Sequence, residues 1–116
     1  MIFVNGLPQD TVPANDRGLL YGDGLFETIR YQNGEPRLWA EHLARLRHGC
    51  QRLNIPFNID GGALLAESGS LAGGHSGTLR LTVTRGVGPR GYRPPAPAST
   101  NRIMQFSATV EGSTEN

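Results

Sequence analysis

Apolar and polar residues alternate along several parts of this chain, as they do in β-strands that bury one face. The clearest case is segment 77–85, where Leu79, Leu81 and Val83 face one way and the residues between them face the other. Alternation, or a high content of β-branched and aromatic residues, predicts strands in four segments: 2–5, 25–32, 77–85 and 101–110.

A hairpin and two helices are predicted between the second and third of these strands. The Asn-Gly dipeptide at 33–34 favours a tight turn, and segment 36–38 is expected to return along the preceding strand. A helical period follows over 39–55, with one apolar stripe: Trp39, Leu43, Leu46, Cys50 and Leu53. A weaker helix is expected over 60–71, with Asp60 as its cap. Strands interrupted by helices predict an α+β fold with the helices on one face of the sheet.

Composition and charge argue against several functional classes. The chain has 116 residues, which suits one domain or one part of a larger enzyme. Its formal net charge of +1 gives no reason to expect nucleic acid or a membrane surface as partner. No apolar run reaches the roughly 18 residues of a transmembrane helix, and a signal peptide is not expected. The single cysteine, Cys50, excludes an internal disulfide and fits a reducing compartment, so we expect a cytoplasmic protein.

The candidate anion-binding groups are arginines, of which the chain has eleven, whereas it has no lysine. Arg45 lies on the long helix away from its apolar stripe, either as a phosphate or carboxylate ligand or as an ordinary solvated residue. Arg85, Arg90 and Arg93 lie in a loop rich in Gly and Pro, with Tyr92 among them. This loop either binds an anion or is an ordinary surface loop. Its mixture of Tyr, Arg and Gly makes single-stranded nucleic acid a weaker alternative partner.

The segment Asp16–Arg30 reads DRGLLYGDGLFETIR and shows no helical period. Its three glycines predict a bulge or a close approach of the backbone to a neighbour, but their spacing is not that of a nucleotide-binding loop. Glu27 is expected to be a paired or sheet-edge carboxylate rather than a functional acid. The three histidines lack a metal-ligand spacing with Cys50, so no metal site is predicted.

Three motifs, taken together, resemble the fold-type IV pyridoxal-phosphate (PLP) enzymes. They are DRGLLYGDGLFETIR at 16–30, HLARL at 42–46 and TRGVGPRGY at 84–92. The family includes branched-chain aminotransferases, D-amino acid aminotransferases and 4-amino-4-deoxychorismate lyases. With the helix end CQRLNIP added, the combination is most similar to the lyases.

The resemblance implies a fold, a cofactor and a set of site residues. Residues 1–110 would form the small N-terminal domain, a mostly antiparallel sheet with two helices on one face, and 111–116 would begin a linker. Arg45 would bind the phosphate of PLP. Arg90 and Tyr92 would bind substrate carboxylate, often across a homodimer interface. Phe26 would line the substrate site where aminotransferases have a tyrosine, and its lack of a hydroxyl favours a lyase.

The implied reaction converts 4-amino-4-deoxychorismate to 4-aminobenzoate and pyruvate for folate synthesis. The Schiff-base lysine of the family would lie in a C-terminal catalytic domain beyond Asn116, so the chain contains no catalytic residue and is expected to be inactive alone. Two alternatives stay open: the same domain of a D-amino acid or branched-chain aminotransferase, and a non-catalytic module that binds anions or a partner protein.

Overall fold

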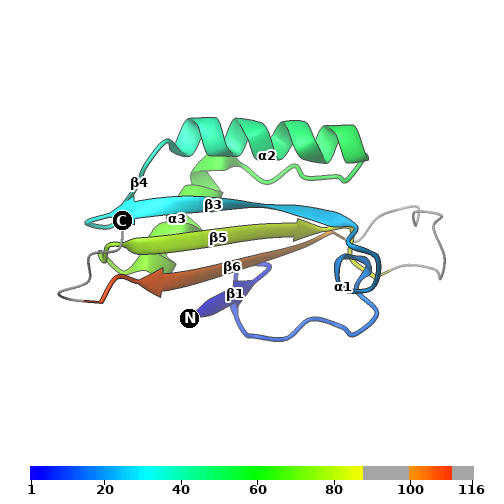
Figure 1. Ribbon diagram of the computed structural model, residues 1–116, viewed down its shortest axis with the longest axis horizontal. Helices are drawn as coiled ribbons and strands as arrows, with labels where there is room; N and C mark the ends of the chain where they lie inside the picture. Colours follow the sequence, from blue (N-terminus) through cyan, green and yellow to red (C-terminus); the bar gives the residue numbers. More distant parts are fainter. Residues whose placement is uncertain (88–99, 111–116) are drawn as a thin grey trace.

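The computed structural model describes residues 1–87 and 100–110, which form one six-stranded sheet with helices packed on one face (Figure 1). The strands are β1 Ile2–Val4, β2 Leu7–Pro8, β3 Gly24–Gln32, β4 Glu35–Pro36, β5 Gly77–Thr84 and β6 Asn101–Ala108. Their order across the sheet is β2-β1-β6-β5-β3-β4, and every neighbouring pair is antiparallel. The predicted α+β class and antiparallel sheet are therefore confirmed.

The two longer helices, α2 Trp39–Leu53 and α3 Gly61–Ala72, share one hydrophobic core with the sheet. Alternate residues of the central strands supply the sheet side of this core: Ile29, Tyr31, Leu79, Leu81, Val83 and Met104. The helices supply Leu46, Cys50, Leu64 and Leu71. The buried Tyr31 hydroxyl shares a hydrogen bond with the Ser68 hydroxyl, which satisfies the polar end of the ring. None of the helices in the described part of the chain is long and apolar enough to cross a membrane.

The helix caps and the hairpin turn follow the local sequence. The Asp60 carboxylate accepts a hydrogen bond from the Ala63 amide at 3.0 Å, as expected of the cap of α3. Asn33 and Gly34 both have positive φ, 52° and 82°, so the predicted hairpin turn joins β3 to β4.

Two expectations near the ends of α2 were wrong. The return strand β4 stops at Pro36, because Leu38 has a φ of 56° and begins the helix instead of extending the strand. Leu53 is 44% exposed although it continues the apolar stripe. The helix ends there, and the left-handed turn at Asn54 sends Ile55 into the core in its place.

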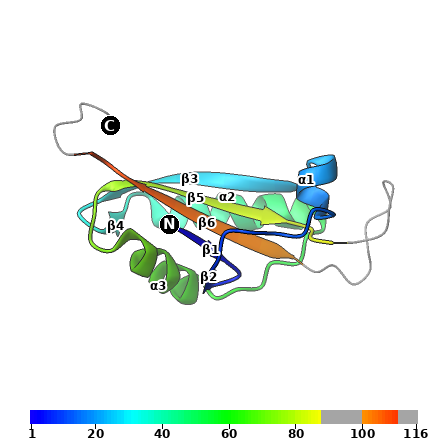
Figure 2. The same ribbon diagram turned by 90° about the horizontal axis from the view of Figure 1, so that it is seen from below.

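A third helix, α1 Arg17–Tyr21, lies within a segment that showed no helical period. It begins at Asp16, whose carboxylate accepts a hydrogen bond from the Gly18 amide, and it ends at Gly22, which has a φ of 68°. Five residues are too few for an apolar stripe to repeat. Both views place α1 at the end of the sheet where β3 begins and β5 ends (Figure 2).

Candidate functional site

Glu27 and Arg45 form a two-point ion pair between β3 and α2. The Arg45 Nε donates to Glu27 Oε2 at 2.9 Å, and its Nη2 donates to Oε1 at 2.8 Å. His42 Nδ1 lies 2.7 Å from the same Oε1, one helical turn before Arg45. The Glu27 side chain is only 7% exposed, so it is a buried carboxylate held by two side chains of one helix face. The expectation that Glu27 is a paired carboxylate is confirmed.

The ion pair with Glu27 orients the guanidinium of Arg45 but does not use all of its N–H donors. Its side chain is 71% exposed, and its Nη1 makes no hydrogen bond to any described residue. Arg45 is thus neither buried nor freely rotating in solvent. An arginine whose carboxylate partner sits behind it presents its remaining N–H groups outward, in the planar geometry that fits phosphate or carboxylate.

Both members of the pair are charged near neutral pH. Burial raises the pKa of the Glu27 carboxyl, but hydrogen bonds and charges from Arg45 and His42 outweigh burial and hold that pKa below its ordinary value. The hydrogen bonds to Glu27 and the charge of that carboxylate raise the pKa of Arg45. The guanidinium therefore stays cationic at any pH at which the protein would be folded.

Phe26 lies on the opposite face of the sheet, because adjacent residues of a strand point to opposite sides. Its ring is 52% exposed and lines a groove of about 450 Å³ with Leu19 and Thr82. The guanidinium carbon of Arg80 lies 4.0 Å from the ring centroid. Phe26 and Arg45 therefore lie on opposite sides of the sheet, with β3 between them.

One edge of β3 is largely open. Strand β4 pairs only with Tyr31 and Gln32, so most of the β3 edge opposite β5 has no strand partner among the described residues. A ligand placed along this edge would have the Arg45 pair on one side of the strand and the Phe26 groove on the other. Arg90, Tyr92 and Arg93 lie outside the described residues, and the site roles of Arg90 and Tyr92 stay predictions.

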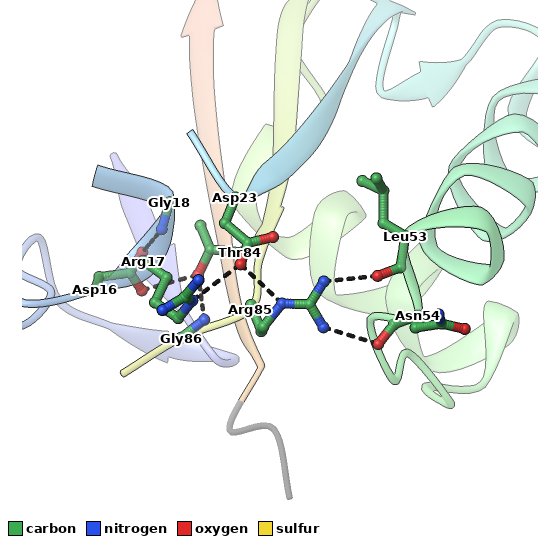
Figure 3. A network of polar contacts seen from close by, with 9 residues as sticks. All are labelled: Asp16, Arg17, Gly18, Asp23, Leu53, Asn54, Thr84, Arg85 and Gly86. Carbon is green, nitrogen blue, oxygen red and sulfur yellow. Dashed lines mark hydrogen bonds and ion pairs between the residues drawn. The ribbon is translucent and has the colours of Figure 1, made fainter. Parts of the chain in front are cut away.

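Arg85 does not take part in an anion site, although the sequence placed it with Arg90 and Arg93 in a loop for which anion binding was one of two interpretations. Its side chain is 7% exposed, and its Nε donates to Asp23 Oδ2 at 2.8 Å. Its Nη1 and Nη2 donate to the carbonyl oxygens of Asn54 and Leu53 at 2.9 and 2.6 Å. These partners are the last carbonyls of α2, so Arg85 ties the end of that helix to β5 (Figure 3).

Arg85 belongs to a buried junction made by α1, β5 and β6, which we call the α1 junction. Its other charged members are Asp16, Arg17 and Asp23. Arg17 Nε donates to Asp23 Oδ2 at 3.0 Å. Asp16 is 1% exposed. Its carboxylate accepts hydrogen bonds from the Gly18 amide at 2.7 Å and the Thr84 hydroxyl at 2.8 Å (Figure 3), and from the Asn101 amide group at 2.7 Å.

The glycines at this junction confirm the predicted close approach, and the neighbour is the protein's own strand β5. A Cβ on Gly18 would lie 2.4 Å from Thr84 Cγ2, and one on Gly24 would lie 2.5 Å from the Val83 carbonyl oxygen. No side chain fits at either position without a shift. The glycine-rich segment therefore packs closely on β5, and several of its residues from Asp16 to Phe26 also contribute to the lining of the groove.

The fold and these motifs have relatives among known proteins. The family model described as "Amino-transferase class IV" matches residues 24–115, most of the chain. The chain belongs to the class IV aminotransferase family. Over 96 residues it is 41% identical to an aminodeoxychorismate lyase of Vibrio harveyi, covering 81% of this chain and 35% of that protein. It is 29% identical over 117 residues to a D-alanine aminotransferase of Staphylococcus aureus strain N315, covering 95% of this chain and 42% of that protein.

Solved structures of class IV aminotransferase relatives share the fold. The 4-amino-4-deoxychorismate lyase of Pseudomonas aeruginosa has a TM-score of 0.82 and 48% identity over 93% of this chain and 40% of its own. A branched-chain aminotransferase of Escherichia coli has a TM-score of 0.83 at 24% identity, covering 93% of this chain and 39% of that chain, and it supports the fold alone. The present chain thus spans well under half the length of the relatives it matches. Class IV enzymes of this fold use PLP, and a hypothetical aminotransferase of Mycobacterium tuberculosis is known in a PLP-bound form (TM-score 0.65, 24% identity, covering 87% of this chain and 35% of that chain).

Two parts of the arrangement were not found from sequence. The α1 junction joins residues that are up to 85 positions apart, so no local pattern contains it. Arg80 alternates with buried residues of β5 and therefore reads as an ordinary solvent-facing strand residue. The one available signal was its register, which places it diagonally across from Phe26 once β3 and β5 are paired.

Proposed function

We propose that this chain is the N-terminal part of a PLP-dependent aminodeoxychorismate lyase that converts 4-amino-4-deoxychorismate to 4-aminobenzoate and pyruvate in folate synthesis. The observation that carries the proposal is the identity to lyases, 41% in sequence and 48% for the solved structure, against 29% for the D-alanine aminotransferase. Phe26 supports the same choice, because a phenyl ring has no hydroxyl with which to bind an amino-acid carboxylate.

Arg45 fits the phosphate end of PLP. Its outward N–H groups are unpaired among the described residues, its orientation is set by Glu27, and its charge is retained at neutral pH. A phosphate carries acceptor oxygens on every side and pairs well with such a guanidinium. When bound, PLP supplies an electron sink for charge that develops on the substrate.

The described residues would bind and orient rather than transfer protons. Glu27 and His42 hold the Arg45 guanidinium in one orientation. Phe26 offers an apolar wall beside the substrate. Arg90 and Tyr92 would bind a substrate carboxylate, and a partner subunit in a homodimer would supply them. The chain has no lysine, so the amine that holds PLP and moves the substrate proton would come from the remainder of the complete polypeptide.

The test is a direct comparison of two reactions on the complete polypeptide. Release of 4-aminobenzoate from 4-amino-4-deoxychorismate is followed by fluorescence, and amino transfer from D-alanine to 2-oxoglutarate is followed in parallel. We expect 4-aminobenzoate release to dominate. Amino transfer without 4-aminobenzoate release would contradict the lyase and leave an aminotransferase, a second candidate that the D-alanine aminotransferase match across 95% of the chain favours.

A further inference from the structure

Arg80 is exposed, and it is the one cation among the described residues that line the groove on the open face of the sheet. The groove has a volume of about 450 Å³, and apolar side chains contribute much of its lining: Val12, Leu19, Leu25, Phe26 and Ile103. Within residues 1–87 and 100–110, Arg80 forms no ion pair with an acidic side chain. An exposed guanidinium beside an apolar surface, with no acid of its own, is a place where a ligand carboxylate is favoured.

The contact with Phe26 gives Arg80 a defined position. Phe26 lies opposite Thr82 in the register of β3 and β5, so Arg80 is its diagonal neighbour. The guanidinium carbon sits 4.0 Å from the ring centroid. A cation–π contact is electrostatic and does not pair the guanidinium N–H groups with an acceptor, so these groups can still donate to a carboxylate.

Among the described residues that line the groove, the one acidic residue is Asp16, and its carboxylate does not compete for this guanidinium. The residues directly opposite Arg80 are Thr28 on β3 and Gln105 on β6, and its other diagonal neighbour on β3 is Arg30. Asp16 also lines the groove, but its carboxylate is buried and already accepts three hydrogen bonds at the α1 junction. The local field on this part of the sheet is therefore positive.

We propose that Arg80 and Phe26 form a carboxylate subsite for a flat, ring-shaped ligand. The inference rests on the proposed lyase function, whose substrate carries two carboxylates. The apolar lining fits the six-membered ring, so we assign Arg80 to the carboxylate that stays on that ring in the product 4-aminobenzoate. The carboxylate that leaves with pyruvate is then bound elsewhere, and Arg90 is its proposed partner.

The test uses a matched pair of probes on the complete polypeptide: 4-aminobenzoate and its neutral analogue 4-aminobenzamide. Titration calorimetry is expected to show the carboxylate binding about tenfold more tightly than the amide, as for one charge-assisted contact. Arg80→Gln is expected to remove this difference, Arg80→Lys to retain part of it, and Arg52→Gln, at an exposed arginine of α2, to leave it unchanged. Unchanged PLP affinity in each variant is expected to show that the fold is intact.

The outcomes separate this subsite from the function on which it rests. Equal binding of the two probes by the unaltered protein would overturn the subsite, because another group of the polypeptide would then neutralise Arg80. A tenfold preference that persists in Arg80→Gln would overturn it as well. A preference that depends on Arg80 in a protein that releases no 4-aminobenzoate would support the subsite and contradict only the lyase function.

Discussion

Two arginine–carboxylate clusters lie along α2, one at the middle of the helix and one at its C-terminal end, and they differ in which arginine donors they leave unpaired. In the middle of the helix, Arg45 donates from Nε and Nη2 to Glu27 and leaves its Nη1 without a partner among the described residues. At the far end, Arg85 has Nε on Asp23 and both remaining nitrogens on backbone carbonyls. The residue types are the same. The difference shows that exposure and unused donors, and not the presence of an ion pair, distinguish an arginine that can bind a ligand from one that holds the chain.

The largest expected effect is on stability at the α1 junction. Arg85→Ala removes a buried cation and leaves the Leu53 and Asn54 carbonyls without its hydrogen bonds. Breaking a buried, hydrogen-bonded ion pair typically lowers the free energy of unfolding by about 3–5 kcal/mol. Urea unfolding measures the loss of free energy of unfolding in Arg85→Ala, and Arg45→Ala is the matched variant for comparison. If the two variants unfold at the same urea concentration, the inference that Arg85 contributes more to stability than Arg45 is wrong.

Close packing at the same junction gives the next effect. Gly18→Ala places a Cβ 2.4 Å from Thr84 Cγ2, so β5 or α1 must move. Overpacking of this kind lowers the free energy of unfolding by about 1–3 kcal/mol. Gly69→Ala in α3 is the control, because its Cβ meets no atom within 4 Å and alanine favours a helix. Equal melting temperatures for the two variants would show that the close approach at Gly18 is not required.

Acid sensitivity should also be greater at the buried cluster. Burial raises the pKa of Asp23, but its hydrogen bonds to Arg85 and Arg17 outweigh burial and hold that pKa below the ordinary 3.8. A carboxylate whose pKa falls on folding stabilises the protein above its unfolded pKa, and this contribution is lost as the pH falls through the folded pKa. Asp23→Asn should therefore flatten the decline in stability below about pH 4.

Glu27 provides the comparison for this pH effect, because its pKa is also lowered but one of its partners is exposed. Glu27→Gln is expected to flatten the acid decline less than Asp23→Asn, and Glu41→Gln, at an exposed position of α2, not at all. Unfolding midpoints measured across the acid range test the order. If stability falls more steeply with decreasing pH in Asp23→Asn than in Glu27→Gln, then Glu27, and not Asp23, makes the larger contribution to acid sensitivity.

The smallest effect on stability, and the largest on ligand binding, is expected at Arg45. Arg45→Ala in the complete polypeptide should weaken PLP binding at least about tenfold, because a charged hydrogen-bonded contact to phosphate is lost. Glu27→Gln should weaken it less, since it only loosens the orientation of the guanidinium. Fluorescence titration with PLP measures both, and Arg52→Ala is the control. Unchanged PLP affinity in Arg45→Ala would remove Arg45 from the cofactor site.

Sequence patterns predicted the layers of this fold because each strand and helix carries its own period. The alternation of Leu79, Leu81 and Val83 correctly predicted β5 and its buried face. The apolar stripe through Leu46 and Cys50 correctly predicted α2 and its buried face. The short helix α1 was missed because five residues do not complete a repeat. The pairing of Arg85 with Asp23 was missed because it depends on the distant turn that brings β5 beside the start of β3.

The candidate site was only partly accessible to the same reasoning. Arg45 came from the motif resemblance, since its position on α2 was equally compatible with a solvated residue. Neighbouring strand positions must point to opposite faces, so the separation of Phe26 from Glu27 follows from sequence. The contact of Arg80 with Phe26, in contrast, required the register of two strands that are distant in the sequence. The roles of Arg90 and Tyr92 remain predictions.

The hydrogen bonds of Asp16 have a consequence for how the family could diversify. This one carboxylate holds Thr84 at the end of β5 and Asn101 at the start of β6, the two stems between which residues 88–99 are inserted. A segment whose stems are fastened to the same anchor can be exchanged, lengthened or shortened while the register of β5 and β6 stays as it is. Substitutions within residues 88–99, which include Arg90 and Tyr92, are therefore expected to leave the pairing of β5 with β6 unchanged.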